Sequence, residues 1–217
     1  ESYRVQHVMT WATEQACREI YLRQFEIPVK EATCEIKYIS DEQGTISTKK
    51  MNACTAAMSS FNFVGTEWSG GRKSLCTNVL RDEWGFDGLV VSDCGAISDF
   101  WEPGAHGVSK DAASASAKAV ISGTDVECGS NYKRLPDAVK AGEITEAQID
   151  TSVVRLLEAR FELGDFDPDS LVEWTRIPES VVACKEHKDL ALQMAREQMV
   201  LLHNRGNILP LAKDASK

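Results

Sequence analysis

The sequence predicts an α/β protein in which parallel strands alternate with helices. Leu89–Val91 is an uninterrupted apolar run that follows Gly88 and is separated by one serine from Asp93. Short apolar runs between turn residues are typical of strands buried on both faces. Strand and helix signals alternate with short links, which favours right-handed crossovers between parallel strands. Asp93 would then stand at the carboxyl ends of the strands, where such proteins carry out chemistry; capping of the next turn is the alternative role.

The first half of the chain is expected to hold a long helix, a hairpin, a strand and a short helix. Residues 10–32 are rich in Glu, Gln, Arg, Ala and Leu, which predicts a long helix that Pro28 should kink or end. Residues 34–52 are polar and β-prone, which predicts a hairpin-like excursion. A second buried strand is expected at residues 56–62. After a glycine-containing loop, residues 74–84 predict a short helix.

The next helix is defined by its capping residues. Ser109 or Asp111 can cap an alanine-rich helix, because both side chains can accept a hydrogen bond from the free N–H groups of a first turn. This helix is expected to run to Ser122 and to end at Gly123, a residue that adopts the left-handed conformation of a helix end. A third short strand is expected at residues 124–128.

A capping box marks the start of a further helix. Thr145 and Gln148 have the spacing of two residues that satisfy each other's backbone N–H groups, and Gly164 is expected to close this helix. A segment with several Asp and Pro residues follows. A last helix is expected over residues 181–203.

These elements are too few for a complete α/β domain. A (β/α)8 TIM barrel takes roughly 250 residues, with about 30 for each strand–helix unit. We therefore expect the C-terminal half of such a barrel, belonging to a larger protein. Its apolar strand edges and helix faces should be exposed unless partner chains cover them, and the isolated piece is expected to self-associate through those edges.

Composition excludes several function classes. The 217 residues carry a formal net charge of -9, which argues against nucleic acid or an anionic membrane as the partner. No apolar run approaches the roughly 18 residues of a membrane-spanning helix. The 7 cysteines are widely spaced and form no C-x-x-C pair, which argues against a zinc site. The sequence also lacks a phosphate-binding loop and a complete calcium loop, so no metal and no cofactor is expected.

Five blocks of the sequence together resemble glycoside hydrolase family 3. They are Met58–Asn62 (MSSFN), residues 80–88 (LRDEWGFDG), residues 90–93 (VVSD), residues 155–164 (RLLEARFELG) and residues 199–211, which end in ILPL. Their order matches the family over nearly the whole chain. The resemblance implies hydrolysis of terminal β-linked sugars with retention of configuration, by a barrel followed by an α/β sandwich domain.

The resemblance also implies a domain organisation. Residues 1–164 would form the partial barrel, with an insertion at about 34–52. Residues 165–180 would be a linker, and residues 181–217 would be the first helix and strand of the sandwich domain. Family members are often secreted or periplasmic, which is what the resemblance implies for the parent protein.

The resemblance makes Asp93 the catalytic nucleophile. Retaining chemistry needs one ionised carboxylate that attacks the anomeric carbon and a second carboxyl group that acts as acid and base. In this family the acid/base usually comes from the second domain, outside these residues, and nothing in their spacing recommends Glu83, Glu102 or Glu127. The expected partners are a β-linked oligosaccharide or glycoside and the remainder of the parent chain. We expect the isolated chain to be inactive.

Departures from the β-glucosidase pattern bear on the substrate. Cys94 follows the nucleophile where β-glucosidases of the family usually have Trp, and Phe61 stands where many have Tyr. Cysteine at this place resembles the β-xylosidase branch, in which a second cysteine lies in a motif similar to that around Cys128. A disulfide between Cys94 and Cys128 and two unbridged buried thiols are both open.

The loop 65–71 instead resembles some bacterial β-glucosidases. Within it, Trp68 could stack on the apolar face of a sugar, or it could anchor the loop as a buried hydrophobe. His106 follows the nucleophile strand and could touch substrate. The residues expected near the sugar are Met58, Phe61, Trp68, Cys94 and His106. A β-xylosidase is slightly favoured over a β-glucosidase; a non-catalytic carbohydrate-binding or scaffold remnant and a homologous phosphorylase are the alternatives.

Overall fold

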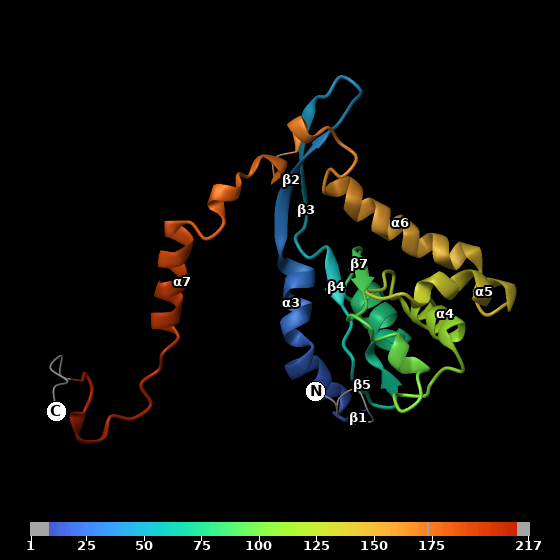
Figure 1. Cartoon of the computed structure of the whole chain (residues 1–217), viewed down its shortest axis with the longest axis horizontal. Coiled ribbons are helices and arrows are strands. Elements are labelled where there is room, and N and C mark those ends of the chain that lie inside the picture. Colours follow the sequence, from blue (N-terminus) through green and yellow to red (C-terminus); the bar gives the residue numbers. More distant parts are fainter. Residues whose placement is uncertain (1–8, 173, 212–217) are drawn as a thin grey trace. The chain divides into compact units, whose positions relative to one another are not determined.

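Figure 1 shows a computed structural model that describes residues 9–172 and 174–211. The chain divides into two compact units, one up to Asp167 and one from Pro168 onward. Each unit is described by itself below. Among the described residues, every helix is too short or too polar to cross a bilayer.

Within residues 9–167 the first unit contains seven strands and several helices. The strands are β1 (Met9–Thr10), β2 (Thr33–Ile39), β3 (Ile46–Asn52), β4 (Ala56–Met58), β5 (Phe63–Val64), β6 (Glu67–Trp68) and β7 (Leu89–Val91). The α-helices are α2 (Glu14–Ala16), α3 (Arg23–Glu31), α4 (Ala112–Ser122), α5 (Leu135–Lys140) and α6 (Glu146–Glu162), with π-helical stretches at Cys17–Tyr21 and Ser74–Glu83.

Parallel pairing around β7 forms the centre of this unit. β4 pairs with β7 in parallel, with Met58 opposite Val91, and Val91 forms a parallel bridge with Val126. The described residues thus place three parallel segments side by side in sequence order, separated by helices, as the α/β class predicts. They form no closed barrel.

Two of the expected strands are much shorter than predicted. The strand expected at residues 56–62 ends at Met58, because the chain then turns into the small β5–β6 hairpin. The strand expected at residues 124–128 is reduced to the single bridge at Val126. Beyond that bridge the Cys128 N–H donates to the Ser92 hydroxyl and not to a backbone carbonyl, so the regular ladder ends there.

The long helix expected over residues 10–32 is wrong in its first part. Thr10 lies in β1, paired with Val64, and the helix begins only after Thr13, whose Oγ1 accepts a hydrogen bond from the Ala16 N–H. A π-helical stretch separates α2 from α3. Pro28 is accommodated inside α3, which ends three residues later at Glu31.

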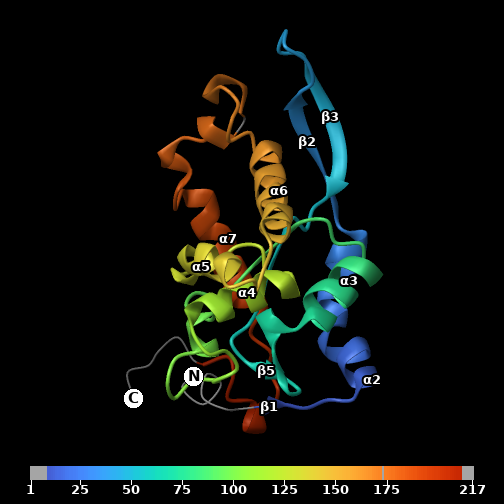
Figure 2. The ribbon, with the colours of Figure 1, turned by 90° about the vertical axis from the view of Figure 1, so that its right-hand side faces the viewer.

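The hairpin prediction is confirmed. β2 and β3 pair antiparallel over their whole length, from Thr33 opposite Asn52 to Ile39 opposite Ile46. The Asp41 carboxylate stabilises the connecting turn by accepting hydrogen bonds from nearby backbone N–H groups. Figure 2 shows that this hairpin extends away from α4 and α5.

The predicted helix caps are confirmed for α4 and α6. Asp111, not Ser109, caps α4: its Oδ1 accepts from the Ser114 N–H at 2.8 Å, and Gly123 closes the helix with φ of 108°. α6 opens with the full Thr145 capping box. The short helix expected over residues 74–84 is also present, in π-helical form. α5 was not predicted, because six residues show no helical period.

Three apolar clusters hold the first unit together. The largest packs the segment 61–68 and the residues after β7 against α4, and its fully buried members include Trp68, Ile97 and Phe100. A second lies between α4 and α5, and a third joins Val29 of α3 to Phe86 and Val90. Packing of α3 and α4 against the β7 region therefore fixes the position of the central strand.

The second unit is built around one helix. α7 spans Lys185–Glu197, which is shorter at both ends than the expected 181–203. At its start, Ala183 has φ of 53°, which interrupts the helical backbone and separates α7 from the 3₁₀ turn Glu179–Val181. Residues 199–202, which begin with Met199, are not helical.

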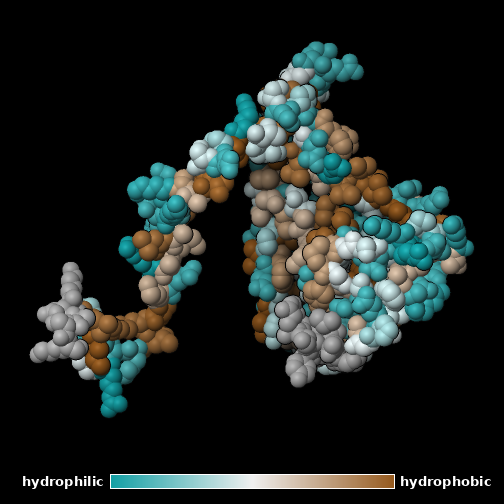
Figure 3. All heavy atoms as spheres, in the orientation of Figure 1, coloured by the Kyte–Doolittle hydropathy of each residue, from teal (hydrophilic) through white to brown (hydrophobic). Residues whose placement is uncertain are grey.

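Apolar side chains remain exposed on both units, as the sequence analysis expected (Figure 3). On α6 these include Val154, Leu157 and Phe161, and in the second unit Leu190, Met199 and Leu202. A soluble protein rarely leaves so many large apolar residues uncovered. Self-association through these faces remains a prediction.

Gly88 provides a test of how closely β4 and β7 must approach. A methyl group at this position would overlap the carbonyl oxygen of Thr55, which precedes β4. We expect Gly88→Ala to lower the free energy of unfolding by about 3 kcal/mol, because backbone has to move to relieve the overlap. Urea denaturation of the chain measures this change.

Gly142→Ala is the matched control. Gly142 has φ of 72° but nothing within 4 Å of an added methyl group, so its cost should be limited to about 1 kcal/mol of backbone strain. Equal losses for the two variants would contradict the close approach at Gly88.

Candidate active site

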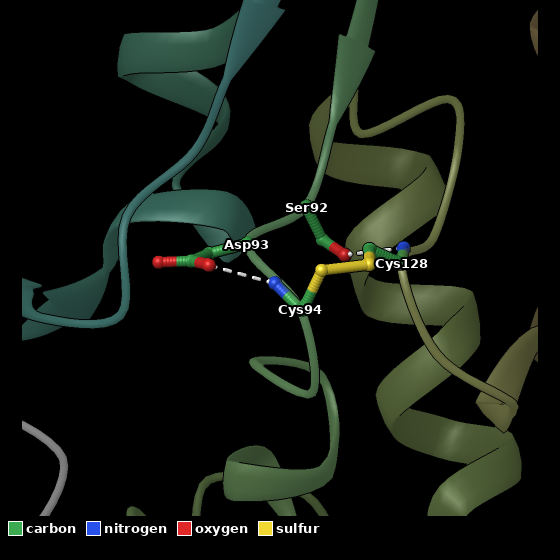
Figure 4. Close-up of a disulfide and its surroundings, with 4 residues drawn as sticks. All are labelled: Ser92, Asp93, Cys94 and Cys128. Atoms are coloured by element: carbon green, nitrogen blue, oxygen red, sulfur yellow. Dashed lines mark hydrogen bonds between the residues drawn. A yellow bond between two sulfur atoms is a disulfide. The ribbon is translucent and has the colours of Figure 1, made fainter.

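Asp93 lies two residues after the end of β7, with its carboxylate directed away from Cys128 (Figure 4). Its backbone N–H donates to the Ser59 carbonyl at 3.1 Å, which continues the pairing with β4 beyond the strand. Its Oδ1 accepts a hydrogen bond from the Cys94 N–H at 2.7 Å. The residue is half-buried, and one backbone N–H holds its carboxylate.

A disulfide joins Cys94 to Cys128 directly beside this carboxylate. The two Cα atoms are 4.4 Å apart, and 34 residues separate the cysteines in sequence. Of the two possibilities that the sequence left open, the structure has the bridged one. Cys94 is exposed, so the disulfide forms part of the surface next to Asp93.

Hydrogen bonds reinforce the same pairing on both sides of the disulfide. The Ser92 N–H donates to the Val126 carbonyl at 2.9 Å, and the Cys128 N–H donates to Ser92 Oγ at 3.0 Å. Beyond the bridge, the Gly95 N–H donates to the Cys128 carbonyl at 2.8 Å. The segment that carries Asp93 is therefore fixed to its neighbour over several consecutive residues.

Met58 lies in the strand next to β7, and Phe61 lies in the connection from that strand to β5. Met58 is the last residue of β4 and is 67% exposed, on the same end of the sheet as Asp93. The Phe61 carbonyl accepts from the Trp68 indole N–H at 2.8 Å and lies 3.1 Å from His106 Nε2. A carbonyl can only accept, so His106 carries its proton on Nε2.

His106 is held within the loop that follows Asp93. Its ring lies edge-on to Phe63, with 4.4 Å between the ring centroids, and its backbone N–H donates to the Asp99 carbonyl at 2.7 Å. Burial raises the pKa of the Asp99 carboxyl group, and the charge of Glu102 adds to the effect. His106 is half-buried, at the side of the 61–63 segment.

The structure corrects the suggestion that Trp68 stacks on a sugar. Trp68 is 1% exposed and packs edge-on against Phe100, with ring centroids 3.4 Å apart. Its indole N–H donates a hydrogen bond to the Phe61 carbonyl. The side chain therefore anchors the loop, because a buried ring has no face to offer a ligand.

The other carboxylates considered from sequence have structural roles. Glu127 uses both oxygens to accept from the backbone N–H groups of Asn131 and Tyr132. Glu83 pairs with Arg18, and the hydrogen bond from that guanidinium lowers the pKa of Glu83.

The sequence reasoning missed Asp125. Its side chain is 0% exposed and forms ion pairs with Arg81 at 2.5 Å and with Arg155 at 2.8 Å. A buried ion pair leaves no periodic signal in a sequence; the only available hint was an acidic residue inside an otherwise buried strand segment.

A family model described as the glycosyl hydrolase family 3 N terminal domain matches residues 42–159. The chain belongs to glycoside hydrolase family 3. This confirms the resemblance of the sequence blocks. The family match also supports the α/β class of the fold.

Individual relatives point the same way. The chain is 54% identical over 149 residues to a xylan 1,4-beta-xylosidase of Xylanibacter ruminicola, covering 68% of this chain and 17% of the relative. It is 35% identical over 147 residues to a periplasmic beta-glucosidase of Salmonella typhimurium, covering 65% and 19%.

A solved structure of a family 3 exo-beta-xylosidase in complex with a xylobiose aziridine activity-based probe is also similar. It has a TM-score of 0.66 and 33% identity, over 74% of this chain and 21% of that one. The chain thus spans about a fifth of the length of these relatives.

The disulfide beside Asp93 gives a test on the chain itself. Replacing both Cys94 and Cys128 with Ser should lower the free energy of unfolding by about 3 kcal/mol, because the bridge restricts the unfolded chain across the intervening residues. Urea denaturation under oxidising conditions measures the change.

Two half-buried free cysteines, Cys34 and Cys184, supply the control. The corresponding double Ser variant should change the free energy of unfolding by less than about 0.5 kcal/mol. Adding a reductant should destabilise this control and leave the Cys94/Cys128 variant unchanged. A reductant effect of the same size on both variants would contradict the bridge.

Proposed function

We propose that this chain is part of a retaining, exo-acting β-glycosidase in which Asp93 is the catalytic nucleophile and terminal β-linked xylose is favoured over glucose. The observation that carries this proposal is the Asp93 carboxylate at the end of a central parallel strand, in a chain that belongs to glycoside hydrolase family 3. The carboxyl ends of parallel strands are the usual place of catalysis in such folds.

The chemistry assigns Asp93 the first step. Its free oxygen attacks the anomeric carbon and forms a glycosyl ester, while the bond from that carbon to the leaving oxygen breaks and a carboxylic acid supplies the leaving group with a proton. Water then attacks the same carbon, gives a proton to the conjugate base of that acid, and breaks the ester bond, which releases the Asp93 carboxylate. The Cys94 N–H, 2.7 Å from Oδ1, orients the carboxylate so that its other oxygen can attack.

The acid/base and the rest of the sugar site are proposed to lie in other parts of a longer protein. In this proposal residues 1–164 are the C-terminal half of a (β/α)8 barrel with an insertion at 34–52, residues 165–180 are a linker, and residues 181–217 begin an α/β sandwich domain. The small share of each relative that the chain covers supports it, as do the apolar faces on α6 and in the second unit.

The disulfide is the main reason for favouring xylose. Where β-glucosidases of the family usually place a tryptophan after the nucleophile, Cys94 is bonded to Cys128 and would form one wall of the sugar pocket. Identity of 54% to a xylosidase, against 35% to a β-glucosidase, supports the same preference. Met58 and His106 are proposed as further pocket residues, with Phe61 between them.

A β-glucosidase is the second candidate. It is favoured by the 65–71 loop, which resembles some bacterial β-glucosidases. A non-catalytic remnant is less well supported, because the Asp93 carboxylate is half-exposed and is held by a backbone N–H, not closed off in an ion pair.

The proposed nucleophile is tested in the longer parent protein. Asp93→Asn should reduce kcat for an aryl β-xyloside roughly 10³-fold or more, since an amide cannot form the glycosyl ester. Asp87→Asn is the matched control, because Asp87 lies exposed in the turn before β7 and should leave kcat unchanged. An Asp93→Asn enzyme with kcat close to that of the parent would exclude Asp93 as the nucleophile.

Substrate preference is read in the same assay. The parent protein should show a higher kcat/KM for nitrophenyl β-xyloside than for nitrophenyl β-glucoside. The reverse order would replace the xylosidase assignment with the β-glucosidase candidate, without affecting the role of Asp93.

The 217-residue chain by itself should not hydrolyse either substrate, because the proton donor is proposed to lie elsewhere. A sensitive fluorogenic β-xyloside measures any residual turnover, with Asp93→Asn as the background. Turnover by the chain that disappears in Asp93→Asn would show that these residues contain both carboxyl groups.

A further inference from the structure

A fully buried carboxylate lies beside the strand that carries Asp93. Asp125 Oδ2 accepts from Arg81 Nη2 at 2.5 Å and from the Val90 N–H at 2.9 Å. Its Oδ1 accepts from Ser152 Oγ at 2.9 Å and from Arg155 Nη1 at 2.8 Å. Four donors from three different elements therefore meet at one side chain.

This carboxylate is hydrogen-bonded directly to β7. Val90, the middle residue of β7, donates its N–H to the Asp125 side chain, and its carbonyl accepts from the Asp125 N–H at 2.8 Å. Arg81, which Asp125 holds, donates a second hydrogen bond to the Gly88 carbonyl at 2.7 Å. Both backbone groups of Val90 and the residue before β7 are thus tied to Asp125.

These hydrogen bonds lie where they set the register between β7 and the neighbouring segment, residues 124–128. Asp125 begins the segment whose later residues, Val126 and Cys128, bind the backbone and side chain of Ser92. A shift of one residue would move Asp93 by about 3.3 Å and turn its side chain to the opposite face of the sheet. An ionic contact that tolerates only one alignment prevents that shift.

The energetics favour a role in register over a role in stability. Burial lowers the pKa of Arg81, which shows that its charged form is disfavoured where it lies, and the charge of Asp125 offsets part of this effect. Buried ion pairs contribute little net stability compared with apolar packing, and a register-setting role is their best-attested use. Among the described residues, the buried apolar residues clustered with Val90 are Val29 and Phe86, and apolar packing is less specific for one alignment than an ionic contact.

We infer that Asp125 is a positioning residue, which sets the register of β7 against residues 124–128 and thereby places Asp93. The part that concerns catalysis rests on the proposed function. The part that concerns register does not, because formation of the disulfide between Cys94 and Cys128 measures the register directly.

The register test uses the 217-residue chain. Equilibration with reduced and oxidised glutathione gives the effective concentration of the Cys94 and Cys128 thiols for each other. After alkylation, tryptic peptides 82–110 and 119–133, which hold one cysteine each, report the bridged fraction. Asp125→Asn should lower the effective concentration at least about tenfold, because the amide has no negative charge and only one acceptor oxygen, so the donors on one side of the side chain lose their partner.

Ser116→Ala is the matched control. Ser116 is also fully buried, and its hydroxyl donates to the Ala112 and Asn131 carbonyls within the α4 region, away from β7. Its loss should destabilise the chain without changing the thiol effective concentration. An equal decrease of the thiol effective concentration in both variants would show that the effect follows general stability, and would overturn the inference. A folded Asp125→Asn chain with an unchanged thiol effective concentration would also overturn it.

Arg155→Met decides the question if Asp125→Asn does not fold. The substitution removes one partner of Asp125, and the Arg155 side chain that is lost is 26% exposed. It should lower the thiol effective concentration by about threefold. Arg134→Met, on an exposed arginine paired with Asp137, should leave it unchanged. No difference between these two variants would overturn the inference.

In the parent enzyme Asp125→Asn should lower kcat and leave KM nearly unchanged. A misplaced nucleophile lowers kcat about tenfold or more while KM stays within about twofold, because ground-state binding does not use the attacking oxygen. A normal kcat with a lowered thiol effective concentration would limit Asp125 to a structural role. A parent that is inactive on all glycosides, with the thiol result as predicted, would count against the proposed function alone.

Discussion

The parallel pairing of β7 with the segment around Val126 is the interaction on which the site depends. β7 is only three residues long, so a few hydrogen bonds decide where the residue after it lies. The pairing continues past the strand through Ser92 and ends in the Cys94–Cys128 disulfide. Asp93 stands between these two attachments. Its carboxylate is therefore held on a fixed piece of backbone and still has one face open.

The surroundings of β7 contribute in two ways. Apolar packing of α3 and α4 fixes the sheet as a whole, and the buried Asp125 network specifies the alignment of one strand with the next. Apolar contacts supply most of the stabilisation but tolerate alternative alignments, whereas ionic contacts add little stability and tolerate few. A site whose function depends on the position of one carboxylate needs both.

Local signals in the sequence were sufficient for the elements that carry strong patterns. The Leu89–Val91 run, the caps at Asp111 and Thr145 and the β-prone hairpin were all predicted, because each depends on residues close together in sequence. The choice between the two roles open to Trp68, the split of the first helix and the Asp125 network were not. Each is decided by contacts from distant residues: Phe100 covers Trp68, Val64 pairs with Thr10, and Arg155 reaches Asp125 from α6.

The most direct measurement of the central claim is covalent trapping of the parent protein with an activated 2-deoxy-2-fluoro-β-xyloside. Such a compound forms the glycosyl ester but hydrolyses it slowly, so that the nucleophile stays labelled. The account predicts a single labelled peptide, residues 82–110, with the ester located on Asp93 by fragmentation. A label on any other carboxylate, or turnover of xyloside without a trapped ester, would contradict it.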